Sequence, residues 1–196
     1  MSILGEIDGA LRGTIALILG DRRGIDALDC TLTGFWRSFF VIVPMLPLLV
    51  VSVVADGDLR AAHGVDTATQ SLAGRLFADG LVWILGWIAF PAVLALLARP
   101  LGLGRVYVPW IVARNWSTLP ATLPYAVVLI GWSLGLLPDA VLAPGTLASL
   151  VFGLFVGWRV AVLVGGQTTG AAIGYTLLDF LLSLVVEVAV DRLFGL

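Results

Sequence analysis

The sequence contains no lysine and few charges of any kind. All 11 basic residues are arginine, and of the 13 acidic residues only Glu6 and Glu187 are glutamate. Charged residues make up 12% of the chain, about half of the roughly 25% typical of a soluble domain. With a hydrophobic content of 60% and a mean hydropathy of +1.06, this shortage excludes an ordinary soluble domain. We attribute the absence of lysine to GC-rich codon usage.

Cysteine and histidine are also scarce. Cys30 is the only cysteine, which excludes an intramolecular disulfide and a cysteine-based metal site. The single histidine, His63, has no serine or cysteine arranged with it for nucleophilic catalysis. Neither Gly102-Leu103-Gly104 nor Gly165-Gly166 follows a strand, so neither is a nucleotide-binding loop. We therefore expect a protein that is not an enzyme, with no catalytic residue, no metal and no cofactor, and without a basic tract for nucleic acid.

Long apolar runs are what the sequence does contain. Several runs near 20 residues carry one charge or none, which is typical of transmembrane helices. The predicted fold is an all-α, polytopic membrane helical bundle with an N-terminal amphipathic helix. Its first part, residues 1–33, is that helix and a polar connector, and residues 34–196 form one transmembrane domain. The five predicted spans cover residues 35–54, 76–97, 119–137, 147–164 and 171–190.

The first 19 residues have the periodicity of an amphipathic helix. Ile3, Ile7, Leu11 and Ile15 stand four apart, which places them on one face. This helix is too short to cross a bilayer, and two interpretations stay open: it lies in the membrane interface, or it packs on a partner. Because Glu6 stands where a signal peptide needs basic residues, we expect the first span to act as an uncleaved insertion signal.

Polar stretches separate the spans. We predict a hydrophilic loop over residues 55–75, an interfacial helix over 106–115, and a short turn over 139–146. The first of these contains His63 with several aspartates, and we favour a solvated loop over a divalent-metal site. Prolines 44 and 47 in the first span and Pro91 in the second predict kinks, because proline cannot donate the helical hydrogen bond.

Three charges lie within predicted spans near the C-terminus. Arg159 is in the fourth span, and Asp179 and Glu187 are in the fifth. An intramembrane charge is costly and marks a functional hypothesis with a partner to be named. Because side chains lean toward the N-terminus of their own helix, Arg159 and Asp179 lean toward each other across the hairpin at residues 165–170. We predict that they pair.

Two interpretations of these charges remain. The first is a structural ion pair that locks the last two helices. The second is a polar path for a proton or small solute, with Asp179 as the titrating group and with Tyr175 and Ser183 on its helix face. An aspartate held by arginine stays ionised and makes a poor proton carrier, which favours the structural pair.

Small residues form a stripe along the fourth span. The members stand four apart and are Ser149, Gly153, Gly157, Ala161 and Gly165. Small residues at this spacing let helix backbones approach closely in lipid. The stripe predicts helix packing, either against the fifth span or against another copy or partner.

The distribution of arginine predicts an orientation. With the N-terminus in the cytoplasm, the inside segments hold seven arginines and the outside segments hold Arg60, Arg75 and Arg192. Seven against three agrees with the positive-inside rule. The inside arginines are Arg12, Arg22, Arg23, Arg37, Arg99, Arg105 and Arg114. We expect a bacterial inner-membrane protein with a cytoplasmic N-terminus and a periplasmic C-terminus.

Five spans after a polar N-terminal segment, with short later loops, resemble the Yip-type five-helix membrane domain. The resemblance covers residues 35–190 and is mainly architectural. The chain lacks the acidic Tyr-Gly-Pro motif of eukaryotic members, and Ile173-Gly174-Tyr175 only echoes their Gly-Tyr signature. The Phe35–Phe39 entry and Asn115-Trp116-Ser117 also look like those of uncharacterised alphaproteobacterial multi-pass proteins. The Yip-type resemblance implies a membrane-organising or partner-binding role.

The leading functional hypothesis is a non-enzymatic membrane subunit that packs with itself or a membrane-protein partner. The alternative is a small transporter or channel component that uses Arg159 and Asp179, and a water-accessible cavity reaching Asp179 distinguishes the two. A lipid-modifying enzyme would need a headgroup site, for which Arg99, Arg105 and Arg114 are available without a visible nucleophile.

Overall fold

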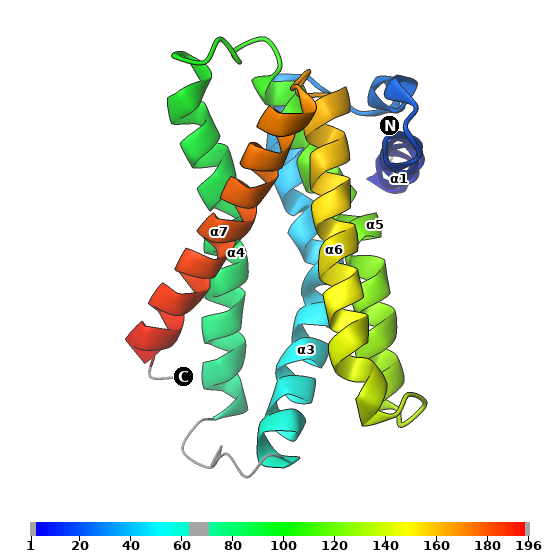
Figure 1. Cartoon of the computed structure of the whole chain (residues 1–196), viewed down its shortest axis with the longest axis vertical. Coiled ribbons are helices and arrows are strands. Elements are labelled where there is room, and N and C mark those ends of the chain that lie inside the picture. The colour runs from blue at the N-terminus through cyan, green and yellow to red at the C-terminus, as the bar shows by residue number, and fades with distance from the viewer. Residues whose placement is uncertain (1–2, 63–70, 195–196) are drawn as a thin grey trace.

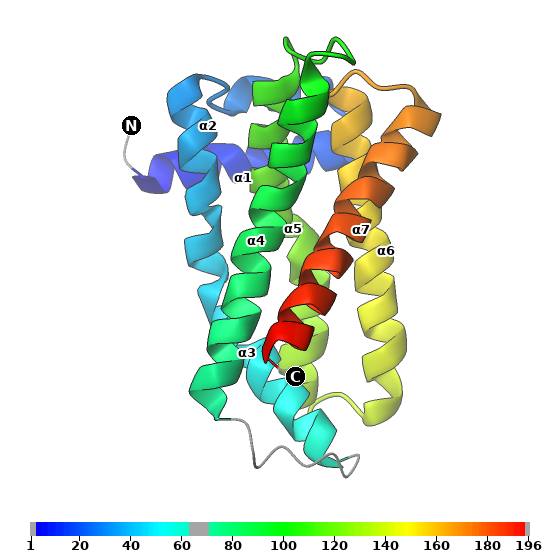
Figure 2. The ribbon, with the colours of Figure 1, turned by 90° about the vertical axis from the view of Figure 1, so that its left-hand side faces the viewer.

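The computed structural model describes residues 3–62 and 71–194 of the chain. Every regular element in that part is helical. The α-helices are α1 (Ile3–Leu19), α2 (Leu32–Ser38), α3 (Ile42–Ala62), α4 (Leu72–Ala98), α5 (Tyr107–Ser133), α6 (Asp139–Leu163) and α7 (Thr169–Phe194). Two short 3-10 helices, η1 (Arg22–Ala27) and η2 (Phe39–Val41), stand before and after α2. Helices α3 to α7 run side by side along the long axis, and α1 lies across them near one end (Figures 1 and 2).

Four helical segments are long and apolar enough to cross a membrane. They are Leu32–Arg60, Leu72–Ala98, Asp139–Leu163 and Thr169–Phe194. Their outward faces expose many large apolar side chains, such as Val151 and Val185. An exposed apolar surface of this extent requires lipid or a partner to cover it. Helices are suited to hydrocarbon because each one satisfies its own backbone hydrogen-bonding groups. The prediction of a helical membrane bundle is confirmed at this level.

Helix α5 is the centre of the bundle and differs from these four. It is the most polar of the long helices, and it is not among the four spans. Trp110, Ile111, Val112 and Ala113 are all buried, and four successive residues point around the whole circumference of a helix. Neighbouring helices therefore cover this first part of α5 on every side, whereas Leu123 and Val127 further along the helix are exposed.

The polar stretches are more helical than predicted. One continuous helix α5 replaces the predicted interfacial helix at 106–115 and the span that follows it. Residues 139–146 are not a turn, because α6 begins at Asp139 directly after Pro138. In the predicted loop at 55–75, α3 continues to Ala62 and α4 begins at Leu72. Hydropathy missed these extensions because a helix can continue through polar residues beyond the end of an apolar run. His63 and Asp66 of that loop lie outside the described residues, whereas Asp56 and Asp58 belong to α3.

The first apolar segment is interrupted where proline demands it. Pro44 cannot donate to the carbonyl of Phe40, and the chain runs as the 3-10 helix η2 just before this point. At the start of α2, the Thr31 side chain accepts a hydrogen bond from the backbone N–H of Gly34 and so fixes the helix start.

Helix α1 and η1 form a compact hairpin against α5 and α6. A Cβ on Gly13 would lie 2.5 Å from the carbonyl oxygen of Gly24, so this hairpin requires glycine at that crossing. Gly20 ends α1 with a φ of 101°. The N–H of Gly20 donates to the carbonyl of Leu17, and the N–H of Asp21 donates to the carbonyl of Ala16. Two of the last carbonyls of the helix are satisfied in this way.

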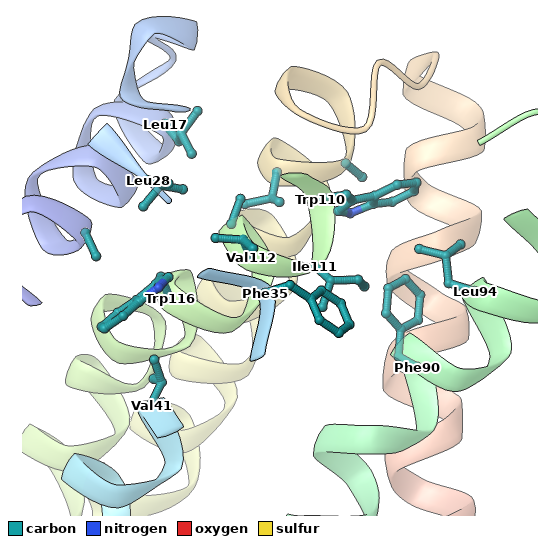
Figure 3. Packing of buried hydrophobic residues seen from close by; sticks show 14 of the residues in the cluster. Leu17, Leu28, Phe35, Val41, Phe90, Leu94, Trp110, Ile111, Val112 and Trp116 are labelled. Carbon is teal, nitrogen blue, oxygen red and sulfur yellow. The ribbon is translucent and has the colours of Figure 1, made fainter. Parts of the chain in front are cut away.

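The buried apolar core lies near the α1 end of the bundle. Phe90 of α4 packs beside Trp110 of α5, with 6.2 Å between their ring centroids. Figure 3 shows other members of the same cluster, namely Leu17 of α1, Leu28 after η1, Phe35 of α2, Val41 of η2, Leu94 of α4 and Trp116 of α5. This packing anchors α5.

Candidate functional site: a polar cavity around Arg114 and Asp179

A cavity of about 540 Å³ lies between α5, α6 and α7. Its volume falls in the range of small-molecule sites, about 300–1,000 Å³. Its polar lining residues are Arg114, Ser117, Thr118, Thr122, Tyr125, Thr146, Ser149, Thr176, Asp179 and Ser183. The cavity therefore combines one charge pair with many hydroxyl groups inside an otherwise apolar bundle.

Arg114 and Asp179 form a two-pronged ion pair in this cavity. Nε of Arg114 donates to Oδ2 of Asp179 at 2.8 Å, and Nη2 donates to Oδ1 at 2.7 Å. The side chains are 17% and 26% exposed. This parallel geometry is the strong form of an arginine–carboxylate pair, and it leaves the cavity without net charge from these two residues.

The predicted partner of Asp179 was Arg159, and the structure corrects this. Arg159 stands two residues after Gly157, which lines the cavity, so it points about 200° away around the α6 axis. Its guanidinium carbon lies 5.5 Å from the ring centroid of Phe155 and 5.6 Å from that of Trp158. The lean of the two side chains along the membrane normal does not fix how each helix is rotated about its own axis. That rotation decides which residues pair.

A buried polar chain leads from the ion pair to α2. Nη1 of Arg114 donates to Oδ1 of Asn115 at 3.2 Å, and Nδ2 of Asn115 donates to Oγ of Ser38 at 2.9 Å. The Ser38 hydroxyl in turn donates to the carbonyl of Phe35 at 2.7 Å. Asn115 and Ser38 are completely buried, and such satisfied networks hold their members rigidly. The guanidinium of Arg114 is thus positioned from both sides.

Most hydroxyls of the cavity are turned toward their own helix backbones. Thr122 donates to the carbonyl of Thr118, Ser149 to that of Gly145, Thr176 to that of Ala172, and Ser183 to that of Asp179. A hydroxyl oxygen keeps acceptor capacity after its proton is used in this way. Ser117 is 2% exposed, and within the described part of the chain its Oγ has no hydrogen-bond partner.

The small-residue stripe on α6 faces inward. Gly157 and Gly165 make close approaches, since an added Cβ would lie 3.3 Å from Thr176 Cγ2 and 2.8 Å from the Trp110 ring. Ala161 is buried. Ser149 and Gly153 line the cavity, and an added Cβ on Gly153 would meet open space. Three of the five stripe residues are therefore tightly packed, and the other two, Ser149 and Gly153, leave room for the cavity.

Tyr175 and Glu187 do not join the ion pair. The ring of Tyr175 packs edge-on against Trp110, with centroids 5.1 Å apart. Glu187 lies toward the other end of α7, where it lines a second polar cavity of about 290 Å³. Of the predicted site residues, the structure therefore brings only Asp179 and Ser183 together in the main cavity with members of the stripe.

Tyr125 stands where three cavities meet. It lines the main cavity, the cavity that contains Glu187, and a third of about 560 Å³ near Trp132. The cavity of Glu187 is acidic, with Asp56, Asp79 and Asp191 beside Arg60. The side chain of Tyr125 therefore borders all three spaces.

From the sequence, we expected Arg114 in an interfacial connector, and we did not expect Asn115 or Tyr125 in a site. A signal for them was present. Arg114, Thr118 and Thr122 stand four apart and form one polar helix face, and Tyr125 follows on the same side.

Among the described residues, no group of three or more histidine, cysteine or acidic side chains is arranged to hold a metal ion.

Comparisons with protein-family models, with curated proteins and with solved structures found no match. The resemblance to the Yip-type domain stays a prediction. The cavity is the feature of the structure that bears on function.

Proposed function

We propose that this protein binds a small polar solute in the cavity between α5, α6 and α7 and moves it through the membrane, as a transporter or channel component. The observation that supports this most directly is the position of Asp179. It lies with Arg114 in a cavity of about 540 Å³ whose lining mixes hydroxyl groups with apolar side chains such as Leu154. Polar cavities within a bundle are costly in a membrane, and they mark solute or ion pathways.

The lining favours a solute rich in hydrogen-bond donors and without net charge. The ion pair is internally balanced, so it attracts neither sign of charge strongly. The hydroxyls of Thr122, Thr176 and Ser183 have donated their protons to backbone carbonyls and offer lone pairs to the cavity. Small amides, urea-like molecules and polyols have the complementary donors.

We also propose that the protein has five membrane spans, in which α5 is added to the four apolar ones. Helix α5 has 27 residues, long enough to span a hydrocarbon core of about 30 Å. It runs beside the four apolar spans (Figure 2). Its polar residues face a cavity and not lipid, which explains its low hydropathy. Helix α1 lies across the bundle, as expected of a helix in the membrane interface.

We place the N-terminus in the cytoplasm of a bacterial inner membrane. Arg114 no longer counts as an interfacial charge, because it is paired inside the bundle. Six arginines then remain for the end that carries α1, against Arg60, Arg75 and Arg192 for the opposite end. The bias still agrees with the positive-inside rule.

Cysteine labelling in intact membranes tests whether the cavity holds water. In a Cys30→Ser background, Ser149→Cys places a thiol in the cavity, and Val151→Cys places one on the exposed apolar face of the same helix. We expect a small hydrophilic thiosulfonate to modify Ser149→Cys much faster than Val151→Cys. Equal protection of both thiols would show a dry bundle and would end the proposal.

Solute flux tests transport directly. Liposomes containing the purified protein should swell faster than empty liposomes in at least one of urea, acetamide or glycerol. Gly153→Phe fills the cavity and should abolish the difference, whereas Val151→Phe on the lipid-facing side should preserve it. A flux that Gly153→Phe leaves unchanged would place the pathway elsewhere.

The partner-binding role loses the feature that motivated it. The stripe of small residues is turned into the bundle, so it offers no surface to a second copy. The role is still compatible with the apolar exterior, but no surface of the described residues favours it over lipid contact.

A further inference from the structure

A second cationic feature lies outside the cavity, where the end of α1 meets α6. If Gly20 carried a Cβ, it would lie 3.2 Å from Nη2 of Arg159. Nε of Arg22 donates to the carbonyl of Leu163 at 3.1 Å. Leu163 is one turn beyond Arg159 on α6, about 6 Å along the axis. Two arginines that are far apart in sequence therefore gather at one junction.

Neither arginine has an anionic partner among the residues that the structure describes. Within residues 3–62 and 71–194, the ion pairs include neither Arg159 nor Arg22. Nε of Arg159 is buried and makes no hydrogen bond there. The nearest acid in sequence, Asp21, is engaged by Arg23, whose Nε and Nη2 donate to its carboxylate at 3.1 and 3.0 Å.

The end of α1 is capped in part by its own backbone. The carbonyls of Leu17 and Ala16 accept from the N–H groups of Gly20 and Asp21. The rings of Phe155 and Trp158 flank the guanidinium and hold it at the junction. A positioned arginine with free donors, beside a second arginine, is a site for a phosphate group, which both can grip.

We propose that this junction binds the phosphate of an anionic phospholipid headgroup. Basic sites between helices near the membrane surface bind such headgroups. The surroundings favour a lipid over free phosphate, because apolar side chains are exposed next to the arginines. Leu19 is 78% exposed and Ile15 is 47% exposed, so acyl chains have an apolar surface beside the headgroup. The site would tie α1 to the membrane and to α6, and it is independent of the solute cavity.

Lipid titration of the purified full chain, followed by native mass spectrometry, tests the proposal. Phosphatidylglycerol should bind the wild type more tightly than phosphatidylcholine. Each arginine near a membrane surface contributes about 1 kcal/mol, so Arg22→Gln should weaken phosphatidylglycerol binding about fivefold and the double variant with Arg159→Gln about 30-fold. Arg99→Gln removes an equal charge from the same end of the bundle and serves as the control.

The outcomes separate the possible ligands. Unchanged phosphatidylglycerol binding in Arg22→Gln, an exposed position that leaves the core intact, would overturn the proposal. Equal losses in Arg99→Gln would overturn it as well, because the attraction would then be a general charge effect. Inorganic phosphate should not displace the lipid at millimolar concentration. If it bound alone and displaced the lipid, the ligand would be free phosphate.

Discussion

Arg114 of α5 and Asp179 of α7 are joined in the lining of the main cavity by two parallel hydrogen bonds of 2.8 and 2.7 Å. The pair joins the central helix to the last helix, and through Asn115 it reaches Ser38 at the start of the first span. It is therefore both the electrostatic centre of the proposed solute site and a structural tie between three segments.

Removing one member of this pair should cost more than removing both. Arg114→Ala or Asp179→Ala leaves a mostly buried charge unpaired, with an expected loss of about 3–5 kcal/mol in the free energy of unfolding. The double variant should lose less than either single variant, because it leaves no unpaired charge. A double-mutant cycle in detergent micelles measures the coupling. Combining Arg159→Ala with Asp179→Ala provides the control, and strong coupling there with none to Arg114 would contradict the structure.

Two glycines of one stripe should respond differently to the same change. Gly157→Leu must push into Thr176, because an added Cβ already lies 3.3 Å from its methyl group. We expect a loss of about 1–3 kcal/mol. Gly153→Leu enters open space in the cavity and should leave the thermal midpoint nearly unchanged. A large loss for Gly153→Leu would mean that the cavity is closed in solution.

Truncating Tyr125 should join the three cavities. Tyr125→Ala is expected to speed solute flux into liposomes, because it removes a side chain that borders all three spaces. Tyr125→Phe should behave like the wild type, since the ring is what blocks the passage. Leu123→Ala on the exposed face of α5 controls for a general loosening of the helix. Flux that is slower in Tyr125→Ala would show that the tyrosine holds the solute and does not divide the path.

Cys30 should alkylate slowly at neutral pH. Partial burial raises the pKa of its thiol above the usual value of 9.0, and the negative charges of Asp29 and Asp26 add to the effect. Since the thiolate is the nucleophile, a raised pKa means that less of it is present at pH 7 to 8. The rate with iodoacetamide should be lower than in the denatured chain and should climb as the pH passes 9. Equal rates in the folded and denatured chain would contradict this.

Much of the architecture was predictable from the sequence. The apolar runs behind α4 and α7 predict helices at residues 76–97 and 171–190, and the structure has them at Leu72–Ala98 and Thr169–Phe194. Length and hydropathy are sufficient there because these helices face lipid on one side, so their composition reflects their surroundings. Helix α5 was predicted as two pieces, since its composition reflects neighbouring helices that a local window does not include.

The candidate site was predicted only in part. Asp179 stood out because a carboxylate within an apolar run needs a partner, and that physical argument holds whatever the fold. Its partner was misassigned, since the choice between Arg159 and Arg114 depends on how α5, α6 and α7 are rotated about their axes. Spacing along one helix contains no information about which face a neighbour covers.

The sequence by itself determined that this chain is a helical membrane protein, because the shortage of charge and the long apolar runs allow no other solvent for its surface. It also determined that Asp179 must be compensated. Only the tertiary structure decided that Arg114 is the partner, that part of the small-residue stripe borders a cavity, and that Arg159 turns away toward α1. These are properties of helix rotation and packing, in which residues far apart in sequence become neighbours.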